Sequence, residues 1–271
     1  MFNDIVGHEN IKRKLQEDIK YNELSHAYVF YGQSGIGKRT LALSLVKELL
    51  GTKNLEACVD FKLIKKADGK QDITVEQIRN TLVTDMYIAP AASKYKVYII
   101  DDAGSMNESA QNALLKTLEE PPSYVIMILI ANSLNSLIPT IISRTNNIFF
   151  KNLTIDEEKQ VLNLLNKNID ERILKLSVGS VGQALDIQDN DIINCLENAI
   201  DYIKSKNILN LLLVFNNIDF KKTIILDCFQ RLLLENALYE LVDVVEAAKN
   251  SMQNNASEEI EKTALAIKLC R

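Results

Sequence analysis

Short apolar runs and helical patterns alternate along the first half of the chain. Residues 97–100 form an unbroken apolar run followed by two aspartates, as expected for a buried parallel strand. Elsewhere apolar residues recur at helical spacing, for example at Leu41, Leu45 and Leu49. The pattern predicts an α/β domain with a parallel sheet over residues 1–150. Its strands are expected at residues 28–31, 59–64, 96–100, 124–131 and 147–150, and its helices near residues 11–19, 41–49, 75–84 and 108–120.

The second half of the chain has a different pattern. Beyond residue 150 there is no proline, and there are only two glycines, which mark a single break. Apolar residues recur at helical spacing, and Thr154 with Glu157 matches a capping box at a helix start. We therefore expect a small helical domain over residues 151–188 and an all-α domain over residues 189–271.

A glycine-rich turn joins the first predicted strand to the helix that follows. The turn contains Gly32, Gly35 and Gly37 and ends in Lys38. Glycines let backbone N–H groups turn toward phosphate oxygens, and the helix N-terminus adds the positive end of its dipole. Strand, glycine loop and helix are the context of a P-loop, in which Lys38 would contact the outer phosphates. We expect these four residues to bind the phosphates of ATP.

The residue after the lysine departs from the P-loop pattern. A Ser or Thr hydroxyl normally holds Mg²⁺ there, but this chain has Arg39. Thr40 comes one residue late, and one residue rotates a side chain by about 100° around the helix axis. Thr40 remains a candidate nucleotide-binding residue. The loop is therefore expected to face a phosphate but to be poorly built to hold the metal.

Polar residues follow two predicted strands at their C-terminal ends, the edge of a parallel sheet where ligands bind. Asp101 is the candidate Mg²⁺ ligand, if a nucleotide binds, and Asp102 follows it. Asn132 follows the next strand, and the family resemblance described below implies that it is a polar contact for the nucleotide. A strand that simply ends in an acidic turn is the alternative explanation for Asp101. The P-loop upstream favours the metal-binding role.

Composition narrows the class of protein further. The net charge of -5 argues against general nucleic-acid binding by bulk attraction. The cysteines are scattered with no C-x-x-C pair, so we expect no zinc site and no disulfide framework. The sequence has neither an apolar stretch long enough to span a membrane nor a signal-peptide pattern. We expect a cytoplasmic protein without membrane contact. We also expect His8 to have a structural rather than a catalytic role.

Four segments match one protein family. They are Gly-His-Glu at residues 7–9, Ser-His-Ala-Tyr at 25–28, Asn-Ala-Leu-Leu-Lys-Thr-Leu-Glu-Glu-Pro-Pro at 112–122, and Ser-Arg-Thr at 143–145. With these segments the chain closely resembles bacterial DNA polymerase III clamp-loader subunits of the AAA+ class. The resemblance is strongest over residues 1–150. It implies a P-loop AAA+ domain, a helical lid over residues 151–188, and a C-terminal all-α collar that holds a ring of subunits together.

The family contains two kinds of subunit with this fold. Gamma/tau subunits bind and hydrolyse ATP, whereas the delta-prime subunit has a degraded site. Here Arg39 replaces the metal-binding hydroxyl, and Asp102 is one methylene shorter than the glutamate that activates water in the motor subunits. Gly182 and Gln183 offer no charge where a motor's lid places its sensor arginine, and the zinc insert of many relatives is absent. These departures indicate a delta-prime-like subunit, with ATP and Mg²⁺ as cofactors only of a degraded site.

Arg144, the centre of the Ser-Arg-Thr tripeptide, receives its catalytic role from the resemblance. In the family this arginine acts in trans, by entering the ATP site of the neighbouring subunit. A trans arginine can be worth roughly 10³ to 10⁵ in rate, because its planar, permanently charged guanidinium suits phosphate oxygens. The alternative is a surface arginine that ends a helix.

The resemblance implies a largely non-hydrolysing component of the DNA polymerase III holoenzyme, a DNA-directed DNA polymerase. The chain would join gamma/tau and delta subunits in a hetero-pentamer that places the sliding clamp on primed DNA. One alternative is an active gamma/tau-like subunit that hydrolyses ATP in cis with Lys38, Asp101 and Asp102. Another is a nucleotide-dependent switch outside replication, against which the segment at 112–122 argues.

Overall fold

The computed structural model describes residues 2, 4–67, 69–188, 192–220, 223–253 and 256–270. The chain divides into two compact units, Met1–Val161 and Leu162–Arg271, each with its own buried apolar core. The domain boundaries expected at residues 150 and 188 remain predictions. The second of them adjoins residues 189–191, which lie outside the described residues.

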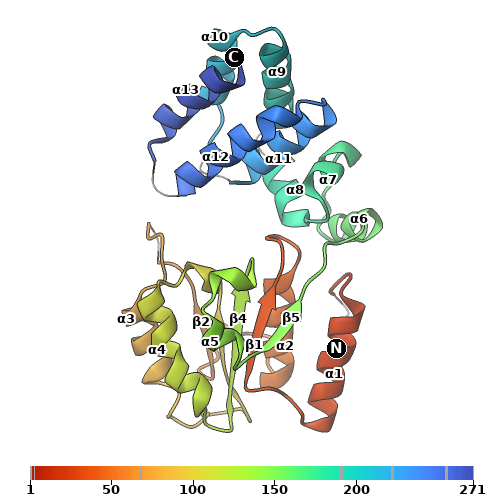
Figure 1. Ribbon diagram of the computed structural model, residues 1–271. Helices are drawn as coiled ribbons and strands as arrows, with labels where there is room; N and C mark the ends of the chain where they lie inside the picture. Colours follow the sequence, from red (N-terminus) through yellow and green to blue (C-terminus); the bar gives the residue numbers. More distant parts are fainter. Residues whose placement is uncertain are drawn as a thin grey trace. The chain divides into compact units, whose positions relative to one another are not determined.

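The first unit is built on a parallel β-sheet. The described strands lie in the order β2-β3-β4-β1-β5, and all neighbouring pairs are parallel (Figure 1). This arrangement confirms the predicted α/β class. The first strand of the sequence thus lies between the last two. The strands are β1 (Ala27–Tyr31), β2 (Phe61–Ile64), β3 (Lys96–Ile100), β4 (Val125–Ala131) and β5 (Asn146–Phe149).

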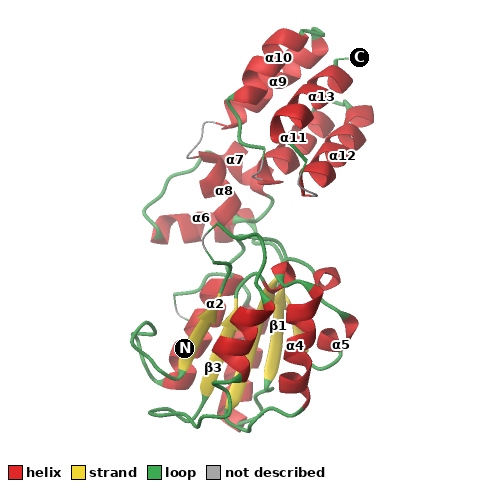
Figure 2. Ribbon diagram, turned by 90° about the vertical axis from the view of Figure 1, so that its left-hand side faces the viewer, coloured by secondary structure: helices red, strands yellow, loops and turns green. Residues whose placement is uncertain are grey.

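Helices cover both faces of this sheet, as Figure 2 shows for α2 on one side and α4 on the other. One core joins alternate strand residues such as Val29 to Leu114 of α4, and the other joins neighbours such as Phe30 to Leu41 of α2. Successive strand residues point to opposite faces, so a strand covered on both faces is apolar throughout. The helices of this unit are α1 (Glu9–Tyr21), α2 (Lys38–Leu50), α3 (Val75–Ile78), α4 (Glu108–Glu119) and α5 (Pro139–Ile142), with 3₁₀ turns at Ala103–Ser105 and Leu134–Ser136.

Side-chain capping interactions define where two helices begin. Asn107 accepts a hydrogen bond from the Ala110 amide at the start of α4, 2.9 Å away. Thr154 and Glu157 form the predicted capping box, because each side chain accepts a hydrogen bond from the other residue's backbone N–H. These interactions satisfy backbone groups that a helix end leaves without partners.

Two expected elements were wrong in detail. The helix expected over residues 75–84 is α3 followed by a π-helical turn (Arg79–Val83), in which the Thr84 N–H donates to the Arg79 carbonyl five residues earlier. The strand expected from residue 59 begins at Phe61, because the preceding residues form a turn in which the Phe61 N–H donates to the Cys58 carbonyl.

After β5 the described residues form helices and connecting turns, without further strands. Their largest core gathers Leu196, Phe215 and Phe229, and the rings of the two phenylalanines meet edge to face at 5.8 Å. The helices are α6 (Ile155–Leu164), α7 (Glu171–Ser177), α8 (Val181–Gln188), α9 (Ile192–Lys204), α10 (Ile208–Asn216), α11 (Thr223–Glu235), α12 (Val242–Gln253) and α13 (Glu258–Leu269), with a 3₁₀ turn at Tyr239–Leu241.

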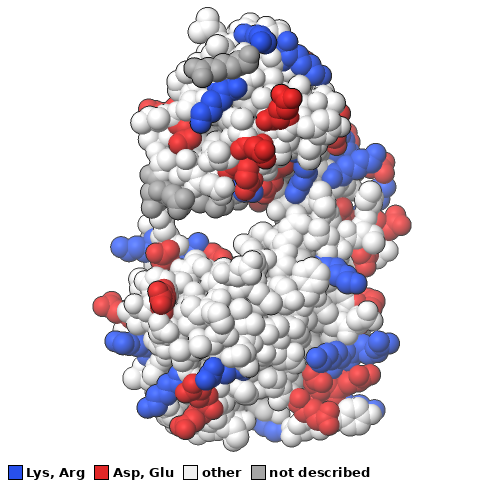
Figure 3. Space-filling view, in the orientation of Figure 1, with Lys and Arg blue, Asp and Glu red and all other residues white. Residues whose placement is uncertain are grey.

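Charged side chains of both signs are interspersed on the face drawn in Figure 3. This mixture agrees with the composition, 31 Lys and Arg against 36 Asp and Glu. That face therefore presents no broad surface of one sign. Among the described residues no helix is both long and apolar enough to cross a membrane.

Candidate nucleotide-binding site

The glycine-rich turn leads from β1 into the N-terminus of α2, as a P-loop does. Gly32, Gly35 and Gly37 have φ angles of 142°, 78° and 98°, which residues with a side chain rarely adopt. A Cβ atom at Gly32 would lie 2.5 Å from the carbonyl oxygen of Phe150. The backbone conformation therefore explains the glycine at each position, and the turn is packed against the residue that follows β5.

Lys38 is buried, and its ammonium group lies inside the turn. Nζ donates to the carbonyl oxygens of Gly32 and Gln33, both at 2.6 Å, and to Oδ1 of Asn132 at 3.3 Å. Burial lowers the pKa of Lys38 to about 8, and the two carboxylates after β3 oppose that shift. The ammonium is thus protonated at pH 7. The structure brings Lys38 and Asn132 together, as expected for a nucleotide site.

Arg39 pairs with the predicted metal ligand. Its Nη1 lies 3.2 Å from Oδ2 of Asp101, so the contact joins α2 to the end of β3. The Arg39 side chain is 51% exposed, while Asp101 is mostly buried. Thr40, the other candidate after the lysine, is exposed. The guanidinium of Arg39 therefore lies beside the carboxylate that would hold the metal in a P-loop protein.

Asp102 pairs with a lysine that the sequence did not single out. Nζ of Lys66 lies 2.8 Å from Oδ2 of Asp102. Asp102 has φ 59° and ψ 52°, in the left-handed region that short polar residues tolerate. Lys66 follows β2, which is the neighbour of β3 in the sheet. The pairing depends on that strand order, so no local signal could have revealed Lys66.

Mg²⁺ does not fit the donor groups at the end of β3. Both carboxylates are paired with cations of the same chain, and the residue after Lys38 is a guanidinium rather than a hydroxyl. Among the described residues no group of three or more His, Cys, Asp or Glu side chains is placed to hold a metal ion. A divalent cation at Asp101 would have to displace Arg39 or lie beside its like charge. We therefore assign no metal-dependent step to this site.

His8 contacts the glycine-rich turn from the N-terminal segment. Its Nε2 lies 2.9 Å from the carbonyl oxygen of Ile36, and because a carbonyl can only accept, this nitrogen carries the proton. Burial lowers the pKa of His8, which favours the neutral ring. The ring also packs on Phe150, with centroids 4.8 Å apart. His8 has the structural role expected of it, and that role is to support the turn.

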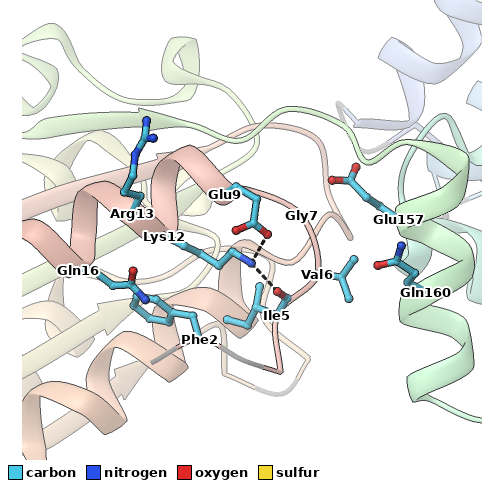
Figure 4. Close-up of a pocket in the computed structure, with 10 residues that line it drawn as sticks. All are labelled: Phe2, Ile5, Val6, Gly7, Glu9, Lys12, Arg13, Gln16, Glu157 and Gln160. Carbon is cyan, nitrogen blue, oxygen red and sulfur yellow. Dashed lines mark hydrogen bonds and ion pairs between the residues drawn. The ribbon is translucent and has the colours of Figure 1, made fainter.

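A cavity of about 570 Å³ lies beside this segment, between α1 and α6 (Figure 4). Figure 4 shows Glu157 and Gln160 reaching it from α6. The buried Lys12 contacts the carbonyl oxygen of Ile5 at 2.7 Å and Oε1 of Glu9 at 2.6 Å. Since Lys12 is already paired within the segment, we expect phosphates to bind at the turn rather than in this cavity.

Arg144 lies between α5 and the start of β5, whereas the glycine-rich turn follows the end of β1, so the two lie at opposite ends of these parallel strands. Nη2 lies 2.7 Å from Oε1 of Glu119, the last residue of α4, and Nη1 donates to the Thr140 carbonyl at 3.1 Å. The side chain remains 36% exposed. Glu119 belongs to the segment at 112–122, but its pairing with Arg144 was not expected from the sequence. The guanidinium is thus held at the surface and is partly accessible.

Gly182 and Gln183, which stand where the resemblance implies the sensor arginine of a motor subunit, lie in the first turn of α8. The Gln183 N–H donates to Oγ of Ser180 at this helix start. Neither residue is cationic, so the first turn of α8 has no positive charge at these two positions.

Comparison with known proteins supports the resemblance. A family model described as DNA polymerase III, delta subunit, matches residues 7–154. DNA polymerase III subunit gamma of Buchnera aphidicola subsp. Acyrthosiphon pisum is 32% identical over 232 residues, which are 78% of this chain and 63% of that protein. DNA polymerase III subunit tau of Bacillus subtilis is 33% identical over 218 residues, which are 74% of this chain and 38% of that protein. The chain therefore spans less than two thirds of the length of these curated relatives.

A solved structure shares the fold. It is the crystal structure of a DNA polymerase III gamma subunit-related protein from Thermotoga maritima, with a TM-score of 0.60, 15% identity, and coverage of 94% of this chain and 98% of that chain. At that identity the likeness concerns the fold alone. The family model, in contrast, matches the sequence over the P-loop, the segment at 112–122 and Ser-Arg-Thr. Because this match covers more than half of the chain, the protein belongs to the DNA polymerase III delta subunit family.

Proposed function

We propose that this chain is a delta-prime-like subunit of the DNA polymerase III clamp loader. It would complete a pentameric ring with gamma/tau and delta subunits, which loads the sliding clamp on primed DNA, and it would hydrolyse little or no ATP itself. The observation that carries the proposal is the ion pair between Arg39 and Asp101, because it puts a cation of the chain on the carboxylate expected to hold Mg²⁺.

A second group needed for ATP hydrolysis in cis, the one that activates water, also differs from that of a motor subunit. Asp102 stands where a motor subunit has its water-activating glutamate, and Lys66 holds its carboxylate at 2.8 Å. A general base must lie within hydrogen-bond reach of the proton that it takes, and Asp102 is one methylene shorter than that glutamate. The loss of one well-placed electrostatic group can lower a rate by roughly 10² to 10³. Two such losses at one site support weak or absent ATPase activity.

Arg144 would instead act on a neighbouring subunit. Its guanidinium is partly exposed and is held by Glu119, which is itself half exposed. An exposed pair of this kind is worth only about 0–1 kcal/mol, so a phosphate group of a neighbour's ATP can replace Glu119 at little cost. Charge-assisted hydrogen bonds from arginine to phosphate are stronger and often bidentate.

The helices beyond residue 189 would form the collar of the ring, and residues 151–188 would form the lid. α10 and α13 pack together, yet Leu209 of α10 is 76% exposed, and Ile260 of α13 is exposed as well. Exposed large apolar side chains of this kind favour a contact with another protein surface. The collar would work in the cytoplasm as part of a soluble complex.

An active ATPase of the gamma/tau kind is the second candidate. The relatives described above are named gamma and tau, and Lys38 lies against the turn and Asn132 as a working phosphate site requires. In this candidate, Thr40 or a water molecule would have to contact the metal, because Arg39 stands where the Ser or Thr hydroxyl of a P-loop normally does so.

The deciding measurement is steady-state ATPase activity of the purified chain, with Lys38→Ala as the control. We expect turnover at the background level for both proteins. Clear turnover that Lys38→Ala abolishes would overturn the non-hydrolysing assignment and establish the second candidate.

The role of Arg144 is tested in a loader reconstituted with gamma/tau and delta subunits. Arg144→Ala is expected to lower the DNA- and clamp-stimulated ATPase rate of the complex at least about tenfold, since one trans arginine can be worth much more. Arg79→Ala, at an exposed arginine of the same unit, is the matched control and should leave the rate unchanged. Equal rates for the two variants, with intact complexes, would contradict a role in trans.

A further inference from the structure

We infer that the P-loop of this chain binds the phosphates of a nucleotide without a divalent cation, with Arg39 supplying positive charge in the metal's place. The inference rests on one part of the proposed function, namely that the glycine-rich turn is a nucleotide site. It concerns binding by the chain itself, so it does not depend on Arg144 acting on a neighbour.

The charges of the site support the inference. Lys38 and the two aspartates after β3 would alone give a net charge of −1, and a divalent cation would raise that charge to +1. Arg39 and Lys66 supply the same two positive charges from the chain, since each pairs with one aspartate, at 3.2 Å and 2.8 Å. The site therefore reaches the charge of a metal-loaded P-loop with no metal present, and it attracts a polyphosphate.

Arg39 has donors left for such an anion. A guanidinium carries five N–H groups, and its contact with Asp101 is made by Nη1. The side chain is half exposed, so its other donors are accessible to solvent. Arg39 is also the second residue of α2, directly after the lysine whose ammonium lies inside the turn. The positive charges of Lys38 and Arg39 thus add to the backbone N–H groups of the P-loop in attracting an anion to the start of α2.

The same contacts predict an unusual effect of Mg²⁺. An ordinary P-loop protein gains affinity from Mg²⁺, because a hydroxyl and a carboxylate coordinate the metal that accompanies the nucleotide. In this chain Arg39 occupies the carboxylate of Asp101. Mg²⁺ also cancels part of the negative charge of the nucleotide, which weakens its attraction to Arg39. Addition of Mg²⁺ should therefore leave the affinity unchanged or reduce it.

The test is equilibrium binding of ATP to the whole chain by isothermal titration calorimetry, in EDTA and in excess Mg²⁺. We expect the wild type to bind ATP at least as tightly in EDTA as in Mg²⁺. Arg39→Ser should lose about tenfold or more of the affinity in EDTA, the factor expected for a charge-assisted contact, and should bind better when Mg²⁺ is added. Arg39→Lys keeps the charge but loses the planar set of donors, so its affinity in EDTA should lie between those of Arg39→Ser and the wild type.

Lys47→Ser is the matched control, because it removes a positive charge from an exposed position of the same helix. It should bind as the wild type does, and circular dichroism checks that each variant is folded. Binding of the wild type only in Mg²⁺, no binding in either buffer, or equal affinity of the wild type and Arg39→Ser in EDTA would each overturn the inference. None of these results would alter the expected effect of Arg144→Ala on the assembled loader, so the two proposals fail separately.

Discussion

Asp60 is a buried carboxylate whose replacement tests how the first unit is held together. The residue is 1% exposed and lies just before β2. Its Oδ1 accepts a hydrogen bond from the Ala91 amide at 2.7 Å, and its Oδ2 accepts from the Ala92 and Ser93 amides, both at 2.9 Å. One side chain thus fixes the loop that leads into β3, the strand that Asp101 and Asp102 follow.

Asp60→Asn keeps the shape of the side chain but replaces one of its two acceptor oxygens with an NH₂ donor. Whichever way the new amide group turns, its NH₂ faces at least one of the three backbone N–H groups. The remaining hydrogen bonds also lose their charge-assisted strength. Because the loop residues Ala91 and Ala92 are themselves exposed, water can partly replace the lost acceptor. We therefore expect a loss of about 1–3 kcal/mol in the free energy of unfolding.

Urea unfolding followed by far-ultraviolet circular dichroism measures this loss, since the chain has no tryptophan. Native-state hydrogen exchange at β2 and β3 assigns the transition to the first unit. Asp72→Asn, at an exposed aspartate, is the control. If Asp60→Asn unfolds within about 0.5 kcal/mol of the wild type, as surface substitutions do, the three amide contacts do not hold the loop.

The pH dependence of this difference has a defined sign. Burial alone would raise the pKa of Asp60, but the hydrogen bonds from the loop amides and Ser93 outweigh it and hold the pKa below the ordinary value of 3.8. Because the pKa of Asp60 is lower in the folded than in the unfolded state, its ionised carboxylate stabilises the folded state fully at pH values above the unfolded pKa. This stabilisation is lost as the pH falls through the folded pKa. The stability gap between wild type and Asp60→Asn should be constant near neutral pH and should shrink below pH 3.8.

Three further predictions concern the site and the cores. Gly32→Ala should cost at least about 2 kcal/mol in thermal or urea unfolding, because φ is 142° and the new Cβ would meet a backbone carbonyl oxygen at 2.5 Å; a variant as stable as the wild type would refute the close packing. Leu114→Ala, in the core under α4, should cost about 2–5 kcal/mol, whereas Leu209→Ala, at an exposed leucine, should cost under about 0.5 kcal/mol, and equal losses would contradict the assigned core. Burial raises the pKa of the Cys228 thiol to about 11, so Cys228 should react with a disulfide reagent much more slowly than the partly exposed Cys58 in the folded chain, and at a similar rate in urea.

Most of the fold could be predicted because its signals are local. Strands β3 and β4 are buried on both faces, so apart from Lys96 at the start of β3 their residues are apolar in unbroken runs that the sequence shows directly. The Asn107 cap and the capping box of α6 join residues three positions apart. The π-helical turn after α3 has no such signal, because it differs from the expected helix only in a hydrogen bond to the fifth preceding residue.

The sequence indicated which residues are candidates for the site, but it did not indicate how their side chains pair. The positions of Lys38, Asp101 and Asn132 follow from their place at the C-terminal ends of strands and the start of a helix. The ion pair between Arg39 and Asp101 joins residues 62 positions apart, and it requires both the strand order and a side-chain conformation. Sequence reasoning recognised that Arg39 was unsuited to hold a metal, yet it could not show that the guanidinium would bind the carboxylate.

The strand order of the first unit also has a consequence for how the protein is made. β1 leaves the ribosome first among the strands, but its two partners are β4 and β5, which end at Ala131 and Phe149. At about 5–20 residues per second, the apolar segment Ala27–Tyr31 must wait on the order of ten seconds before either of its edges can be covered. The nascent chain thus carries an unpaired hydrophobic strand through most of the synthesis of this unit, and a fragment that stops short of β5 would leave that strand open to other chains.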